Sequence, residues 1–211
     1  AYNNEGDNAT DKHLRGYYIL GNDIDCAGVT YRADGRDANK TFVGTFDGRG
    51  YTISNLNAGA NGIFSVLAGT VKNVNFVDVS IVKDNYHFTA LLAGQSWGNT
   101  TIENVDVTFK TIEWPINNAF ADWAATGLLV ARLGNTNTIK IENVTLDATG
   151  LAITNALGCE ITGVQYNNVT IKGDSVSLIA CTGANSSTGI SEWPTGVTYM
   201  DTCEEFTVDT T

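Results

Sequence analysis

Residues 71–74 read Val-Lys-Asn-Val, and this apolar-polar-Asn-apolar phrase returns along the chain. The other copies are Ile53-Ser54-Asn55-Leu56, Ile102-Glu103-Asn104-Val105, Ile141-Glu142-Asn143-Val144 and a degenerate Ile161-Thr162-Gly163-Val164. The third position of each copy falls at 55, 73, 104, 143 and 163, so two of the steps are short and two are long. We interpret the short steps as a base period of about 20 residues, and the long steps as that period with loop insertions.

A second phrase, apolar and bounded by glycine, precedes most of these copies. Its members are Gly62-Ile63-Phe64 to Gly69, Ala90 to Gly94, Gly127 to Gly134, Leu151 to Gly158 and Ser177 to Gly183. A unit of about 20 residues is too short for a pair of helices, whereas it can hold three short strands. Within the units Val, Ile, Thr and Phe alternate with polar residues, which indicates strands with one buried face. The sequence therefore predicts an all-β parallel β-helix of about five or six coils, with two loop insertions.

The recurring asparagine suits a bend between two strands, because Asn tolerates left-handed backbone angles and bonds to its own backbone. Asparagines stacked on successive coils can also exchange amide hydrogen bonds as a ladder. Turn preference alone would give the same pattern, so both interpretations stay open at this point.

Composition excludes several classes of protein. The chain has 211 residues, with 12 Lys and Arg against 23 Asp and Glu, and a net charge of −11. No basic stripe is present to neutralise phosphates, so we expect no nucleic-acid partner. No apolar stretch reaches the length needed to span a membrane. Since the chain opens at Ala1 and not at Met, we expect a processed product or a piece of a longer polypeptide.

These residues suggest a family. Residues 62–74, Gly-Ile-Phe-Ser-Val-Leu-Ala-Gly-Thr-Val-Lys-Asn-Val, resemble the GLUG motif of bacterial cell-surface proteins. Residues 42–53 and 18–25 are similar to the strands that open pectin-lyase-like β-helices. The resemblance covers residues 17 to about 183 and is sharpest in residues 17–81. It implies a right-handed β-helix on an exported, surface-displayed protein. It does not imply an enzyme, because GLUG-bearing proteins are mostly adhesin-like, while pectin-lyase-like relatives include both catalysts and inert shafts.

We expect a single domain over residues 1–211 with capped ends. Residues 1–16 are polar and form the predicted N-terminal cap, residues 17–183 the coils, and residues 184–211 the C-terminal cap or an interface segment. Strand edges left unpaired at the two ends of a β-helix invite stacking. Simple capping is one interpretation, and joining to neighbouring copies or to the rest of a longer chain is the other.

The four cysteines are Cys26, Cys159, Cys181 and Cys203. None forms a C-x-x-C pair and the chain has two histidines, so we expect neither a metal site nor a cofactor. The last three cysteines are evenly spaced, at a distance close to the predicted coil length, so an adjacent pair could close the C-terminal end. A Cys181–Cys203 disulfide is the preferred hypothesis, and a fully reduced set is the alternative.

Catalysis would need carboxylates gathered on one face. The best group comprises Asp23, Asp25, Asp34, Asp37 and Asp47, with Arg32, Arg36 and Arg49. Asp47-Gly48 and Asp34-Gly35 are turn dipeptides, however, which favours a structural role for these carboxylates. We therefore predict no catalytic residue.

Aromatic residues gather in the predicted insertion at residues 111–126, where Trp114, Phe120 and Trp123 lie, and Trp97 occupies the turn of the preceding unit. Aromatic rings on a loop can stack on sugars or anchor a protein partner. The alternative is that the loop folds back and packs these rings against the coils.

The sequence thus predicts a non-enzymatic, extracellular β-helix that acts by rigid display and subunit contacts. A surface adhesin, an extracellular filament subunit and a virion fibre all fit, with self-association or continuation into a larger surface protein. The alternative is a pectin-lyase-like β-helix that binds or cleaves a polysaccharide.

Overall fold

The computed structural model describes residues 12–31, 41–58, 61–81, 88–96, 98–113, 125–133, 138–154, 156–158, 163–177 and 192–202. Within these residues the regular structure is β, apart from one short 3-10 helix, η1 (Lys12–Leu14). The strands are β1 (Tyr17–Ile19), β2 (Ile24–Asp25), β3 (Thr30–Tyr31), β4 (Thr41–Phe42), β5 (Thr45–Asp47), β6 (Thr52–Ser54), β7 (Asn57–Ala58), β8 (Phe64–Leu67), β9 (Thr70–Ile81), β10 (Phe88–Thr89), β11 (Ala93–Ser96), β12 (Thr100–Ile112), β13 (Ala125–Thr126), β14 (Val130–Leu133), β15 (Ile139–Thr154), β16 (Val164–Ser177) and β17 (Val197–Asp201).

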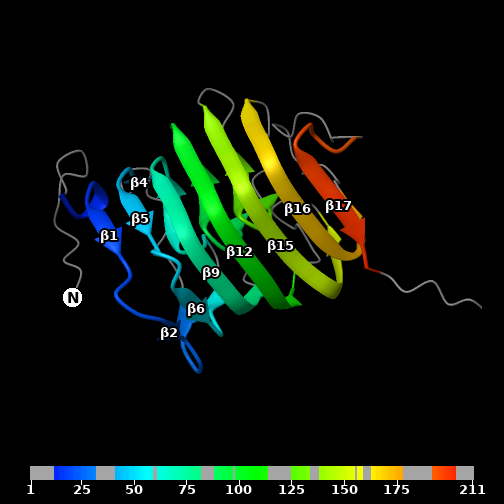
Figure 1. Ribbon diagram of the computed structural model, residues 1–211, viewed down its shortest axis with the longest axis horizontal. Coiled ribbons are helices and arrows are strands. Elements are labelled where there is room, and N and C mark those ends of the chain that lie inside the picture. Colours follow the sequence, from blue (N-terminus) through cyan, green and yellow to red (C-terminus); the bar gives the residue numbers. More distant parts are fainter. Residues whose placement is uncertain are drawn as a thin grey trace, which may run out of the picture.

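One large sheet runs the length of the molecule. Its main path is β1-β5-β9-β12-β15-β16-β17, and the short strands β2, β6, β3 and β7 join it through β9. Figure 1 shows these strands side by side, in chain order from the N-terminal to the C-terminal end. Each pairing between the described strands is parallel, so the sheet is built from successive passes of the chain and contains no described hairpin.

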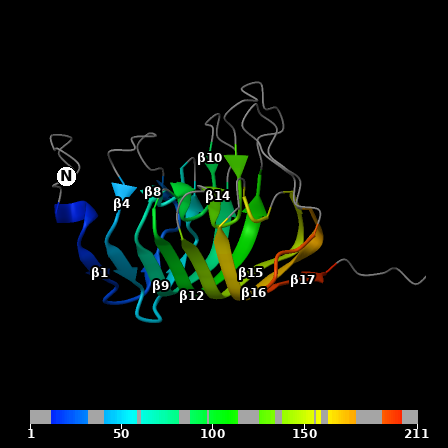
Figure 2. The same ribbon diagram turned by 90° about the horizontal axis from the view of Figure 1, so that it is seen from above.

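Two smaller sheets complete the fold. One has the order β14-β11-β8-β4, and the other pairs β10 with β13. Figure 2 shows β4, β8, β10 and β14 on the opposite side of the molecule from β9, β12, β15 and β16. The chain visits the three sheets in the same order on repeated passes, from β8 to β9 and β10, then from β11 to β12 and β13. This all-β, parallel arrangement is compatible with the expected β-helix.

Apolar residues stack in columns between the layers. One column comprises Ile24, Ile53, Phe76, Val107, Leu146, Ile171 and Tyr199. A second comprises Tyr18, Phe46, Val71, Ile102, Ile141 and Tyr166. The central members are almost fully buried, with Val71 and Ile102 at 0% exposure. Because equivalent positions of successive strands stack in register, alternation along one strand becomes a continuous core through the molecule.

The predicted base period of about 20 residues, the length of a short solenoid repeat, is wrong. In register, Phe46 stacks on Val71, Val71 on Ile102, and Ile141 on Tyr166, so each of these passes is longer than the predicted period. The short spacing arose because Asn55 belongs to a second bend, at which Ile53 stacks on Phe76. Two bends with the same local requirements select the same phrase, and sequence spacing alone does not separate them.

The glycine-bounded phrase, by contrast, marks true equivalents. Phe64 pairs with Ala93, and Ala93 with Val130, so three of the predicted copies stack in one sheet. Their neighbours Leu67 and Leu133 are buried against the core. The repeated apolar run is therefore the strand that closes the layer opposite the large sheet.

Candidate functional site

The predicted ladder of asparagine side chains is present along the large sheet. The amide Nδ2 of Asn104 donates to Oδ1 of Asn73 at 2.9 Å, that of Asn143 to Asn104 at 3.1 Å, and that of Asn168 to Asn143 at 2.9 Å. All four residues have φ of 52–53°, in the left-handed region. Asn is among the few residue types that visit this region readily, so one side chain both makes the bend and ties the passes together. Of the two interpretations of the repeated asparagine, the ladder is confirmed for Asn73, Asn104 and Asn143, whereas Asn168 was not among the predicted copies.

Two copies of the phrase do not join this ladder. Asn55 donates instead to Oδ1 of Asp25 at 2.8 Å, at the other bend. Gly163 was predicted as the last copy, but the ladder passes through Asn168 in the sequence Tyr166-Asn167-Asn168-Val169. The last step of the ladder is therefore 25 residues, longer than the step that the phrase predicted.

Asp47 terminates the ladder at its N-terminal end. Its carboxylate accepts hydrogen bonds from the Tyr17 hydroxyl at 2.7 Å, the Asn73 amide at 3.1 Å and the Arg49 backbone N–H at 2.9 Å. The Lys72 ammonium lies 3.9 Å away. The hydrogen bond from Tyr17 is the main cause of the lowered pKa of Asp47, since it stabilises the charged form, and the Asn73 and Arg49 bonds act in the same direction.

The other described carboxylates of the candidate catalytic group also hold backbone turns. Asp25 accepts from the Asn55 amide and from the Ala27 N–H, which together lower its pKa. Asp23 accepts from the backbone N–H of Thr52 at 2.8 Å. Asp34, Asp37, Arg32 and Arg36 lie outside the described residues. The described carboxylates, Asp23, Asp25 and Asp47, are thus engaged as bend and ladder supports.

A polar groove follows the ladder on the outside of the sheet. It has a volume of about 560 Å³ and crosses the passes of β9, β12, β15 and β16. One wall is the ladder itself, and the other is a second column in which Asn75, Asp106, Thr145 and Thr170 stack in register. The full lining is Gly50, Asn73, Asn75, Asn104, Asp106, Asn143, Val144, Thr145, Asn168 and Thr170. The groove was not predicted from the sequence, since the second column carries no shared motif.

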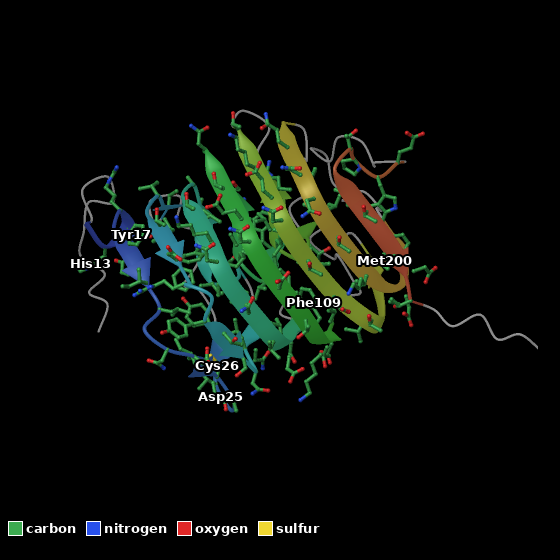
Figure 3. The ribbon with its side chains drawn as sticks, in the orientation of Figure 1. His13, Tyr17, Asp25, Cys26, Phe109 and Met200 are labelled. Atoms are coloured by element: carbon green, nitrogen blue, oxygen red, sulfur yellow. The ribbon has the colours of Figure 1, made fainter. Side chains whose placement is uncertain are left out.

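The two ends of the described sheet differ. At the N-terminal end β1, β2 and β3 each pair on one side only, with β5, β6 and β7. Large apolar side chains are exposed there: Tyr17, Tyr18, Ile19, Ile24, Val29 and Tyr31. At the other end the rings of Trp193 and Tyr199 stack at 5.1 Å, and Met200 is exposed. Figure 3 shows Tyr17 and Met200 at these opposite ends.

The structure describes none of the residues predicted for partner binding or for the disulfide. Trp97, Trp114, Phe120 and Trp123 lie outside the described residues, as do Cys159, Cys181 and Cys203. Cys26 is a free cysteine, half-buried against the core, and burial raises the pKa of its thiol. The aromatic loop and the Cys181–Cys203 pair therefore stay predictions.

In the part of the chain that the structure describes, no three His, Cys, Asp or Glu side chains gather closely enough to hold a metal ion. No helix in that part is long and apolar enough to cross a membrane.

Comparison with known proteins gives one match. Residues 7–108 are similar to a family model described as the M26 IgA1-specific metallo-endopeptidase N-terminal region. The matched stretch contains Asp47, which terminates the ladder, and the first two ladder asparagines, Asn73 and Asn104. The match is to the N-terminal region of such a peptidase and does not itself show enzymatic activity. No curated protein and no solved structure matches the chain.

Proposed function

We propose that the chain is a right-handed parallel β-helix that serves as a non-enzymatic structural or adhesive module of an extracellular protein. Parallel pairing on every described pass, the in-register apolar columns and the asparagine ladder support the β-helix. The GLUG-like sequence and the match to an N-terminal region of a peptidase support a module that displays or positions other parts of a surface protein. This proposal keeps the chain as one domain over residues 1–211.

The observation that carries the subunit contact is the apolar N-terminal end. Tyr18 and Ile24 are the first members of the two core columns, yet they are 39% and 41% exposed, whereas their equivalents Val71 and Phe76 are buried. The backbone edge of β1 beside them is unpaired on its outer side within the described residues. An apolar patch next to an open strand edge is the usual signature of an interaction surface.

We propose that a second copy of the chain covers this end through a two-fold contact. Among the described residues, the C-terminal end exposes Met200 as its one large apolar side chain, together with Glu192. A head-to-tail contact would set the apolar N-terminal patch against this more polar face. A two-fold contact sets the patch against itself, which buries apolar surface on both sides.

Light scattering with size exclusion tests this contact. We expect the mass to rise from monomer toward dimer as the concentration rises from micromolar to about millimolar. Ile19→Lys combined with Val29→Lys should abolish the rise, because both side chains are exposed on the patch. Val77→Lys is the matched control, since Val77 is also exposed but lies on β9 away from the end. A monomer at every concentration, or association unchanged by the double variant, would contradict the proposed contact.

Polysaccharide binding is the second candidate function, and the polar groove favours it over cleavage. Asp25 and Asp47, the acids that we considered for catalysis, are already bonded to bends and ladder. We therefore expect no turnover of a glycan panel by the purified chain. Turnover that Asp47→Ala or Asp25→Ala abolishes, while circular dichroism shows an intact fold, would overturn the non-enzymatic assignment.

A further inference from the structure

We infer that the groove along the asparagine ladder is a binding site for an extended, neutral polysaccharide. None of the residues that line the groove belongs to the exposed apolar patch at the N-terminal end. This assignment rests on the second candidate function, polysaccharide binding, and deepens it by naming the class of polymer and the site; it does not depend on the end contact.

The ladder asparagines retain hydrogen-bonding capacity that the ladder does not use. An Asn amide offers two N–H donors and two acceptor lone pairs. The ladder bonds of Asn104 use one N–H toward Asn73 and one lone pair toward Asn143. Asn104, Asn143 and Asn168 are nevertheless exposed, so the rest of each amide faces the groove and solvent. A column of fixed amides therefore presents one donor and one acceptor per pass.

The polar groups of the groove are preorganised. The ladder amides are held by each other and by a fixed left-handed backbone, and the facing column of Asp106, Thr145 and Thr170 lies on paired strands. Equivalent groups recur at the inter-strand spacing of about 4.8 Å, so the four asparagines span about 14 Å. A ligand that repeats along its own length can use such sites in succession, and little side-chain entropy is lost when it binds.

The chemistry of the groove lining excludes other classes of ligand. No Lys or Arg lines the groove, Asp106 is its one carboxylate, and the chain carries a net charge of −11. Nucleic acids and acidic polysaccharides would be repelled. The one apolar side chain of the lining, Val144, is buried, so the groove offers no exposed apolar surface to a lipid or an apolar peptide. Amides and hydroxyls suit the hydroxyl groups of neutral sugars.

Affinity electrophoresis through gels that contain a neutral β-glucan, a neutral mannan or polygalacturonate tests the site. We expect retardation by at least one neutral polymer and none by polygalacturonate. Thr145→Phe places a ring in the middle of the groove and should weaken binding about tenfold or more. Thr101→Phe is the matched control, because Thr101 is equally half-buried on the outer face of the large sheet but does not line the groove.

A measurement on the unaltered chain keeps the test independent of the variants. On addition of oligosaccharides of the retarding polymer, the side-chain NH₂ resonances of Asn104 and Asn143 should shift in nitrogen-edited NMR spectra. Equal retardation of Thr145→Phe and the control, or shifts confined to other residues, would overturn the assignment. Absence of retardation by both neutral polymers, or stronger retardation by polygalacturonate, would do the same.

Discussion

At the residue scale, the ladder asparagines combine three physical requirements in one side chain. Each makes a left-handed bend, satisfies a neighbour on the next pass, and presents the rest of its amide to the groove. At the N-terminal end of the ladder, the bend is made by Arg49 and Gly50, which both have positive φ. The side chain at this level is therefore the carboxylate of Asp47, which accepts a hydrogen bond from the backbone N–H of Arg49. Bend geometry therefore decides which side chain can fill each rung.

Asn104→Ala tests the structural part of this role. Alanine would lose both ladder bonds and would adopt the left-handed backbone at a penalty, so we expect a loss of about 2–4 kcal/mol in the free energy of unfolding. Asn104→Gly should cost less, because glycine accepts the bend. Asn167→Ala is the matched control, since Asn167 is exposed next to Asn168 but has an ordinary backbone. Urea unfolding gives all three values, and equal losses for Asn104→Ala and Asn167→Ala would refute the role.

Acid should destabilise the fold through Asp47. Its folded pKa is lowered by the Tyr17 hydroxyl, so the unfolded chain binds the proton more readily. The stabilisation is then complete above the unfolded value of about 3.9 and is lost as the pH falls through the lower folded value. Asp25 and Asp147, whose pKa values are also lowered, act in the same direction.

Tyr17→Phe removes the first donor to Asp47 and is the sharpest check of this acid dependence. We expect a smaller loss of unfolding free energy than in the unaltered chain when both are titrated with urea between about pH 5 and pH 2. The two proteins should differ most at the upper end of this range and converge at its lower end. Parallel curves would show that the Tyr17 bond does not govern the ionisation of Asp47.

At the element scale, the sequence predicted strands and their stacking better than the length of a pass. Alternation in residues 70–81 and 100–112 is a local property, so β9 and β12 could be predicted. Pairing across the sheet decides which copies of the phrase stack on each other. The bends at Asn55 and Asn73 share the same local sequence pattern, so the pattern does not distinguish them. The repeated motif identified three of the four ladder asparagines but did not separate a ladder from plain turn preference, and it missed Asn168. The facing column of Asn75, Asp106 and Thr145 emerges only from register.

Close packing between passes also depends on glycine where two backbones meet. A Cβ on Gly69 would lie 2.2 Å from the carbonyl oxygen of Gly44 on the preceding pass. Gly69→Ala should therefore destabilise the fold by about 1–3 kcal/mol, since one backbone must move. Gly21→Ala is the control, because an added Cβ there meets nothing within 4 Å. In thermal unfolding, we expect a lower midpoint temperature than that of the unaltered chain for Gly69→Ala alone. Equal midpoints for Gly69→Ala and Gly21→Ala would disprove the close contact.

At the scale of the whole molecule, stability should follow position along the stack. The central passes bury their columns on both sides, as Val74, Val105 and Val144 show with exposures of 0–1%. The first pass has a described neighbour on one side only, and all three residues of β1 are exposed. A repeat architecture held by nearest-neighbour contacts should therefore open from its ends.

Amide hydrogen exchange checks this gradient directly. We expect opening free energies that approach the global value for amides of β9, β12 and β15, and much lower ones for β1. Trp193 stacks on Tyr199 of β17 and packs against the core, whereas all three residues of β1 are exposed, so β17 should exchange more slowly than β1. Raising the protein concentration should protect β1 selectively if a second copy covers the N-terminal patch, and Val29→Lys should remove that extra protection. Uniform protection across all strands would instead indicate a single cooperative unit in which the ends are as stable as the centre.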